Sequence, residues 1–209
     1  ARNMGKVKAL ALGDFTVNMG QGLTQWQSLA FRKGPDVVNI KRQATVRPYS
    51  AAGEYNFHRG IGITLGNDKW QSTVFASYKK IDANFVSDSL ESVDDFVSSF
   101  QISGLHRTKS ETADKNSQRQ LAFGGNLAYQ FKRLHVGINA IHFQFSVPVN
   151  KGKDPYNFYA LSGKSFGNYS IDYSYTYKNW HVFGEAATTH NGNQAFVNGL
   201  LFSASSQVD

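Results

Sequence analysis

The sequence predicts an all-β protein: an antiparallel, up-and-down transmembrane β-barrel, of which this chain supplies about eight strands of a larger barrel. Three observations lead to this prediction. Apolar and polar residues alternate over long stretches, the polar partners are small and uncharged, and short connections alternate with long ones. The composition agrees, because 14% of the 209 residues are aromatic and only 18% are charged, against roughly 25% charged in soluble domains.

The alternation is clearest between Tyr169 and Tyr177, where every second residue is Tyr or Ile and those between are Ser, Asp or Thr. The stretches from Trp70 to Tyr78 and from Leu121 to Phe131 repeat the pattern, with Gly, Ala, Asn, Gln, Ser and Thr on the polar side. A soluble sheet usually carries many Lys and Glu on its outward face, whereas small polar residues are typical of a barrel interior. A soluble β-sandwich or lipocalin-like barrel remains the alternative.

The strand-like segments approach the roughly 9–11 residues with which a tilted strand crosses a bilayer. They are Val7 to Met19, Tyr55 to Leu65, Trp70 to Ile81, Gln120 to Phe131, Leu134 to Phe145, Tyr159 to Tyr177, Trp180 to Thr188 and Ala195 to Ala204. The alternation changes phase near Ala140 and Ile141, which predicts a β-bulge there.

The connections between these segments differ in length. Short turns are expected at 66–69, 132–133, 178–179 and 190–193, and long outer loops at about 27–54, 82–119 and 147–158. Tight turns on one side and long loops on the other are typical of outer-membrane barrels. We treat 1–209 as one barrel segment of a longer polypeptide, whose open edges are paired by missing strands or by other envelope proteins.

No residue pattern predicts catalysis. The chain has no cysteine, and its six histidines do not stand near carboxylates at a metal-ligand spacing, so neither a metal site nor a cofactor is predicted. The run Gly20-Gln21-Gly22-Leu23 lacks the Gly-Lys-Ser/Thr ending of a phosphate loop and is interpreted as structural. Glu185 lies at an inward position and is expected to pair with an inward Lys or Arg of a neighbouring strand. We therefore predict that the protein is not an enzyme.

The net charge is +7, and two of the long loops contain clusters of cationic residues. The candidate polyanion-binding residues are Arg32, Lys33, Lys41, Arg42 and Arg47 in the first loop and His106, Arg107 and Lys109 in the second. Folded over the barrel mouth, they would form an electropositive funnel for an anion or a polyanion such as DNA. The alternative is that these charges pair with local acids or with lipopolysaccharide phosphates. Aromatic residues for base stacking are sparse among them, so nucleic acid stays open as a partner.

Several short motifs carry a family resemblance. They are Gly13-Asp14-Phe15, Gly20-Gln21-Gly22-Leu23, Asp36 to Arg42, Arg47-Pro48-Tyr49, Arg59-Gly60, Ser103 to Thr108 and Gly124-Gly125-Asn126. In order and spacing, over about Leu12 to Phe145, they resemble the barrel region of Bacteroidetes outer-membrane proteins of the helix-hairpin-helix-domain-containing family. The resemblance implies a barrel larger than this chain. It also suggests a link to nucleic acid by analogy with DNA-binding helix-hairpin-helix modules, but that module is absent here and no functional residues carry over.

The functional expectation is an integral protein of the bacterial outer membrane that contacts lipid and lipopolysaccharide. It would act as a channel or as a component of an envelope transport or secretion assembly. Two alternatives stay open: a surface receptor that binds a polyanion through basic outer loops, and a soluble β-barrel carrier of an apolar ligand.

Overall fold

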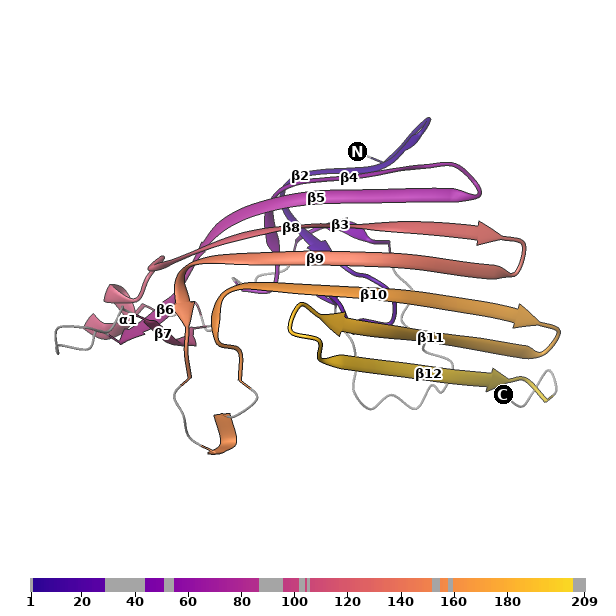
Figure 1. Ribbon diagram of the computed structural model, residues 1–209. Helices are drawn as coiled ribbons and strands as arrows, with labels where there is room; N and C mark the ends of the chain where they lie inside the picture. Colours follow the sequence, from indigo (N-terminus) through magenta and orange to yellow (C-terminus); the bar gives the residue numbers. More distant parts are fainter. Residues whose placement is uncertain are drawn as a thin grey trace.

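The computed structural model describes residues 2–28, 44–50, 55–86, 96–101, 104, 106–151, 155–157 and 160–204. Within these ranges twelve strands form one sheet, in the order β1-β2-β4-β5-β8-β9-β10-β11-β12, with β3 paired to β2 and β6 paired to β7. Pairing is antiparallel except for a single parallel contact between β7 and β9. Figure 1 shows the long strands running side by side from β2 to β12. The all-β, up-and-down prediction is confirmed.

The long strands correspond to the segments expected from the alternation. They are β2 (Val7–Val17), β4 (His58–Gly66), β5 (Trp70–Ile81), β8 (Gln118–Phe131), β9 (Leu134–Val149), β10 (Gly163–Tyr177), β11 (Trp180–Thr189) and β12 (Gln194–Phe202). Their ends differ from the expected ones by a few residues, because neighbouring strands extend the pairing: β9 continues to Val149, which pairs with Gly163.

Shorter elements occupy the longer connections. They are β1 (Arg2–Met4), β3 (Val46–Pro48), β6 (Ala83–Val86), β7 (Phe96–Phe100), the helix α1 (Lys109–Ala113) and a single 3-10 turn, η1 (Pro155–Asn157). In Figure 1, β6, β7 and α1 lie together beyond one end of the long strands. Among the described residues, no helix is long and apolar enough to cross a bilayer.

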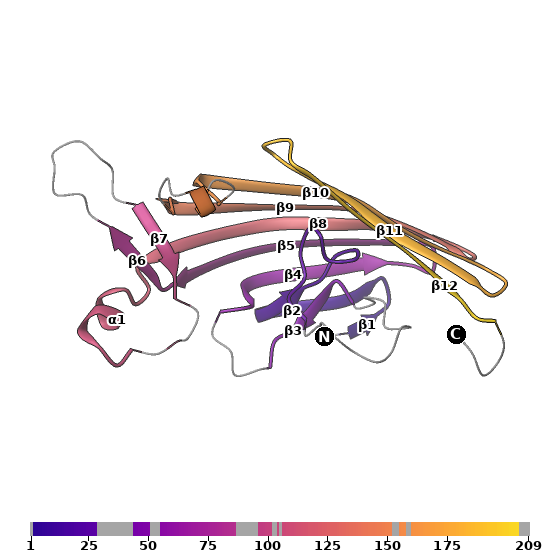
Figure 2. The same cartoon turned by 90° about the horizontal axis from the view of Figure 1, so that it is seen from below.

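The sheet curves, and its two faces differ in chemistry. Because cross-strand partners share a face, the register brings the exposed apolar side chains together on the convex face. We call this set the outer belt: Leu12, Ile61, Leu65, Trp70, Val74, Tyr78, Leu121, Phe123, Leu127, Phe131, Ile138, Tyr169, Ile171, Tyr173, Tyr175, Tyr177, Trp180, Phe196, Leu200 and Phe202. Figure 2 shows the curvature, with β3 and the end of β2 on the inner side.

The packed core lies on the concave face, toward the end of the sheet that carries the longer connections. Phe15, Val17 and Met19 pack there against Phe75 and Ile141. β3 folds over the same face, and Val46 comes so close to Gly62 that a Cβ at position 62 would lie 3.2 Å from Val46 Cγ1. A second buried cluster joins Ile81, Phe145, Val149 and Phe166.

The expected bulge near Ala140 and Ile141 is wrong. β9 pairs without a break with both β8 and β10 through this region, and the irregularity in β10 falls between Gly163 and Ser165. The phase of the alternation changes because apolar residues are needed on both faces: Ile138 belongs to the outer belt, whereas Ile141 is buried in the concave core. A second apolar environment, not an inserted residue, therefore explains the sequence pattern.

Candidate functional site

Residues 18–28, which follow β2, form an inserted loop on the concave side of the sheet. The loop closes on itself: Asn18 and Trp26 form an isolated β-bridge, and Asn18 Oδ1 accepts hydrogen bonds from the amides of Gln27 (3.1 Å) and Ser28 (2.9 Å). The Val17 amide donates to Gln27 Oε1 at 2.8 Å. These bonds satisfy backbone groups that no strand partner reaches, so the loop keeps a defined shape across the inner face.

The tip of the inserted loop surrounds the carboxylate of Glu185. This residue lies on β11, near the other end of the strand order from β2. The amides of Gln21 (2.7 Å) and Leu23 (3.0 Å) donate to Glu185 Oε2, and the hydroxyl groups of Thr24 (3.3 Å) and Ser170 (2.6 Å) donate to Oε1. Glu185 is only 1% exposed. The amides of Gln21 and Leu23 thus converge on one oxygen, and these donors explain how a buried carboxylate is accommodated here.

The glycines of this loop are required by its geometry. Gly20 has φ +50° and Gly22 has φ +90°, a region that residues with a Cβ seldom adopt. A Cβ at Gly20 would lie 2.8 Å from Cδ of Glu185. The run Gly20-Gln21-Gly22-Leu23 is therefore structural, as expected, but the expected partner of Glu185 is wrong. Its partners are backbone amides and hydroxyl groups instead of a Lys or Arg, because the loop approaches too closely for a long cationic side chain.

A row of buried polar side chains continues from Glu185 across the inner face of β10, β9 and β8. Asn126 Nδ2 donates to Asn139 Oδ1 at 2.6 Å, and Asn139 Nδ2 donates to Ser170 Oγ (3.1 Å) and Asp172 Oδ2 (2.7 Å). Since Ser170 Oγ donates in turn to Glu185, four strands and the inserted loop share one hydrogen-bonded network. We call Asn126, Asn139, Ser170, Asp172 and Glu185 the polar row, and each of them is buried.

Most of this network was not predicted from the sequence. Its only signal was that these positions share the inward phase of their strands, which says nothing about which of them meet. The register decides that, by pairing Asn126 with Asn139, Asn139 with Ser170, and Asp172 with Glu185. Within the described residues, no three His, Cys, Asp or Glu side chains come together in a way that could hold a metal ion.

A polar cavity of about 540 Å³ lies between the inserted loop and the short turns. On its wall His135 Nε2 lies 3.2 Å from Asp172 Oδ1, and Thr176 Oγ1 lies 2.7 Å from His181 Nδ1. Gly137 leaves the space that the Asp172 carboxylate occupies, since a Cβ there would collide with Asp172 Oδ2. The cavity falls within the size range of small-molecule sites, but its lining is polar where such sites are mostly apolar.

The predicted polyanion residues do not form one patch in the part of the chain that the structure describes. Arg32, Lys33, Lys41 and Arg42 lie outside the described residues. Arg47 is exposed on β3, whereas Arg107 and Lys109 are exposed at the start of α1. Figures 1 and 2 both place β3 well apart from α1. His106 is turned toward Asp82, with 2.8 Å between His106 Nε2 and Asp82 Oδ2.

Comparison with known proteins identifies no relative from which a role could be transferred. The role of the site is therefore inferred from the geometry of this chain. No protein-family model, no curated protein and no solved structure matches the sequence or the fold.

Proposed function

We propose that the chain forms part of the wall of a transmembrane β-barrel in the bacterial outer membrane, and that it acts as a channel or as a component of an envelope transport or secretion assembly. The observation that carries the proposal is the outer belt. Its side chains are apolar although they are exposed: Leu12 is 71% exposed and Ile171 is 55% exposed. A contiguous exposed apolar surface of this extent is typical of contact with lipid or with another protein.

The distribution of charge on the convex face supports lipid contact. Outward-facing positions at 61–65, 70–78, 121–131, 134–142 and 167–177 carry no Asp, Glu, Lys or Arg. Outward charges lie beyond this zone, for example Asp14, Arg59, Lys80 and Arg119. Lipid excludes charged side chains most strongly at mid-depth, so an uncharged middle with charges at its border matches a membrane-spanning wall.

Aromatic side chains border the uncharged zone on both sides. Close ring pairs mark the short-turn end: Trp70 with Tyr129, whose centroids lie 4.4 Å apart, and Trp180 with Phe202 at 4.3 Å. Tyr78 stands toward the other end of β5, two residues before the outward Lys80. From Trp70 to Tyr78 the strand advances about 27 Å before tilt, close to the roughly 25 Å apolar band of known membrane barrels with aromatic girdles.

The inner face supports a transport role within such a wall. The cavity offers a polar surface on this face, and the inserted loop stands across it, held by the buried polar row. In this proposal the loop is the constriction of the path, and Glu185 holds it in place. Because the attachment of the loop tip depends on one carboxylate, a change at that residue is expected to move the loop.

Detergent folding followed by conductance measurement tests this proposal. We expect heat-modifiable gel mobility in detergent, and a low conductance in planar bilayers that rises in Glu185→Gln, because the neutral amide binds the loop amides less strongly. Glu111→Gln, an exposed acid on α1, is the matched control and should leave conductance unchanged. A protein that is monodisperse in plain buffer and shows no heat-modifiable form would overturn the membrane proposal. Equal conductance in all three proteins would overturn the constriction.

A further inference from the structure

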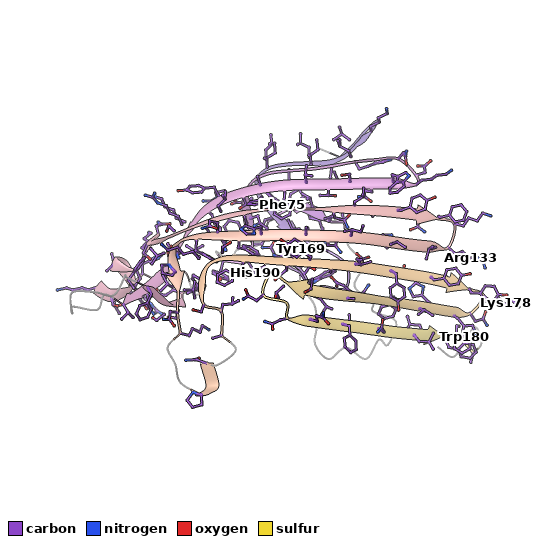
Figure 3. The ribbon with its side chains drawn as sticks, viewed as in Figure 1. Phe75, Arg133, Tyr169, Lys178, Trp180 and His190 are labelled. Atoms are coloured by element: carbon purple, nitrogen blue, oxygen red, sulfur yellow. The ribbon has the colours of Figure 1, made fainter. Side chains whose placement is uncertain are left out.

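The short turns form one continuous edge of the molecule. The backbone oxygen of Lys6, in the β1–β2 turn, accepts from the amide of Gly66 at 2.9 Å. In the same way the Lys69 oxygen accepts from Gln130 (2.7 Å), and the Arg133 oxygen accepts from Thr176 (3.1 Å). Each turn is therefore bonded to the strand beside it. Figure 3 shows Arg133, Lys178 and Trp180 at this same end of the sheet.

This edge is strongly basic. We define the basic rim as its five exposed cationic residues: Lys6, Lys69, Lys132, Arg133 and Lys178. The acid among these turns is Asp68. The opposite end of the sheet also carries acids, as shown by the 2.7 Å pair of Arg59 with Asp14 and by Glu111 in the first turn of α1. The basic rim thus carries five cations against one acid, whereas the opposite end carries cations and acids together.

The rim cations lie against the aromatic side chains of the outer belt. Lys132 Nζ is 5.6 Å from the centre of the Phe131 ring, and Lys178 Nζ is 5.5 Å from that of Tyr177. Both lysines have φ +50°, a conformation in which Asn, Asp and Gly are the usual residues. Two cations at such positions, beside the aromatic border, indicate that the charge itself is useful there.

We propose that the basic rim binds the phosphate groups of an anionic phospholipid surface, and this rests on the membrane location proposed above. Aromatic side chains of membrane proteins sit at headgroup level, so cations placed just beyond them reach the phosphates. The attraction amounts to roughly fivefold in affinity per cation near an anionic surface, and it fades over a Debye length of about 10 Å in 0.1 M salt. The rim thereby fixes the depth of the barrel wall in the bilayer.

The test compares the partitioning of the protein between vesicles of phosphatidylcholine alone and vesicles that also contain phosphatidylglycerol. The rim variant combines Lys69→Gln, Lys132→Asn, Arg133→Gln and Lys178→Asn, with Asn chosen where φ is positive. The control variant neutralises four exposed cations toward the other end: Lys80, Arg107, Lys109 and Lys115, each changed to Gln. Circular dichroism and gel mobility in uncharged detergent verify that all three proteins fold.

We expect the wild type and the control variant to prefer the anionic vesicles, and the rim variant to lose this preference by about tenfold or more. A rim variant that keeps the full preference would overturn the inference. So would a preference that inorganic phosphate abolishes at constant ionic strength, because the rim would then bind a free anion. Equal insertion of the wild type into both vesicles overturns this inference alone, whereas no insertion into either vesicle overturns the proposed function as well.

Discussion

Glu185 illustrates how this molecule stabilises a buried charge without a cation. Hydrogen bonds that involve an ionised partner contribute about 1.5–3 kcal/mol each, and four donors converge on its two oxygens. The donors come from a loop more than 160 residues away in the sequence and from Ser170 on the adjacent strand. The carboxylate therefore joins the first long strand of the sheet to the penultimate one.

Gly20→Ala is predicted to detach the inserted loop. The new methyl group would lie 2.8 Å from Glu185 Cδ at a backbone φ of +50°. Overpacking and backbone strain of this kind cost about 1–3 kcal/mol each. We expect a lower urea midpoint in detergent and faster proteolysis within residues 18–28. Gly13→Ala is the control, since Gly13 also has a positive φ of +95° but has no atom within 4 Å of its Cβ position. Equal effects of the two changes would show that strain alone is responsible.

At the scale of a single strand, a charge placed on the outward face of β10 tests whether the outer belt contacts lipid or water. Ile171→Lys places a charge in the middle of the belt, where lipid contact would cost about 2–4 kcal/mol. In water the same change at a half-exposed position should stay within about 0.5 kcal/mol. Ser174→Lys on the inner face of β10, beside the cavity, is the matched control. Urea unfolding of both variants in lipid vesicles measures the difference, and a neutral effect of Ile171→Lys would contradict lipid contact.

The stability of the helix α1, which lies outside the long strands, is expected to depend on pH. The amides of Thr108 and Arg107 donate to Glu111 Oε2 at 2.9 and 2.7 Å, and these bonds lower the pKa of the Glu111 carboxyl below its ordinary value of 4.5. Because the folded pKa is the lower one, this stabilisation is fully present above the unfolded pKa of 4.5 and is lost as the pH falls through the folded pKa.

We therefore expect α1 to fray on acidification below about pH 4.5 while the sheet persists. The carboxyl and amide resonances of residues 107–113, followed against pH by NMR, measure this. In Glu111→Gln the fraying should lose its pH dependence, because the amide does not titrate. A Glu111 resonance that titrates at the ordinary value would contradict the hydrogen-bonded cap.

At the scale of the whole molecule, the edges of the sheet determine whether the protein associates with itself in water. β12 pairs with β11 on one side, and the described residues contain no strand on its other side. Its apolar residues include Phe196, which is 80% exposed, and Leu200, which is 54% exposed. Unpaired strand edges with apolar side chains associate with one another in water.

We expect the protein to aggregate when expressed and purified without detergent, and to become monodisperse when detergent covers the outer belt. Light scattering after size-exclusion chromatography, with and without detergent, measures this. A stable monomer in plain buffer would count against both the segment expectation and the membrane proposal, and would favour a soluble β-sheet protein.

The strands and turns were predictable because their signal is local. Alternation between Tyr169 and Tyr177 identifies β10, and the polar pairs Lys132-Arg133 and Lys178-Asn179 end the flanking strands. The site was only partly predictable. The Gly20 run has the structural role that was expected of it, but a cationic partner for Glu185 was the wrong expectation, because the sequence shows that a position faces inward and not which groups contact it.

The sequence by itself determined the class of the fold, the strand order along the chain and the chemistry of the two faces, because side-chain alternation has the period of the extended backbone. Only the tertiary structure decided that residues 18–28 turn inward, that Gln21 reaches Glu185, and that Ile141 belongs to a core. These contacts depend on the curvature and on the summed register of every intervening strand, and no local pattern of residues records either quantity.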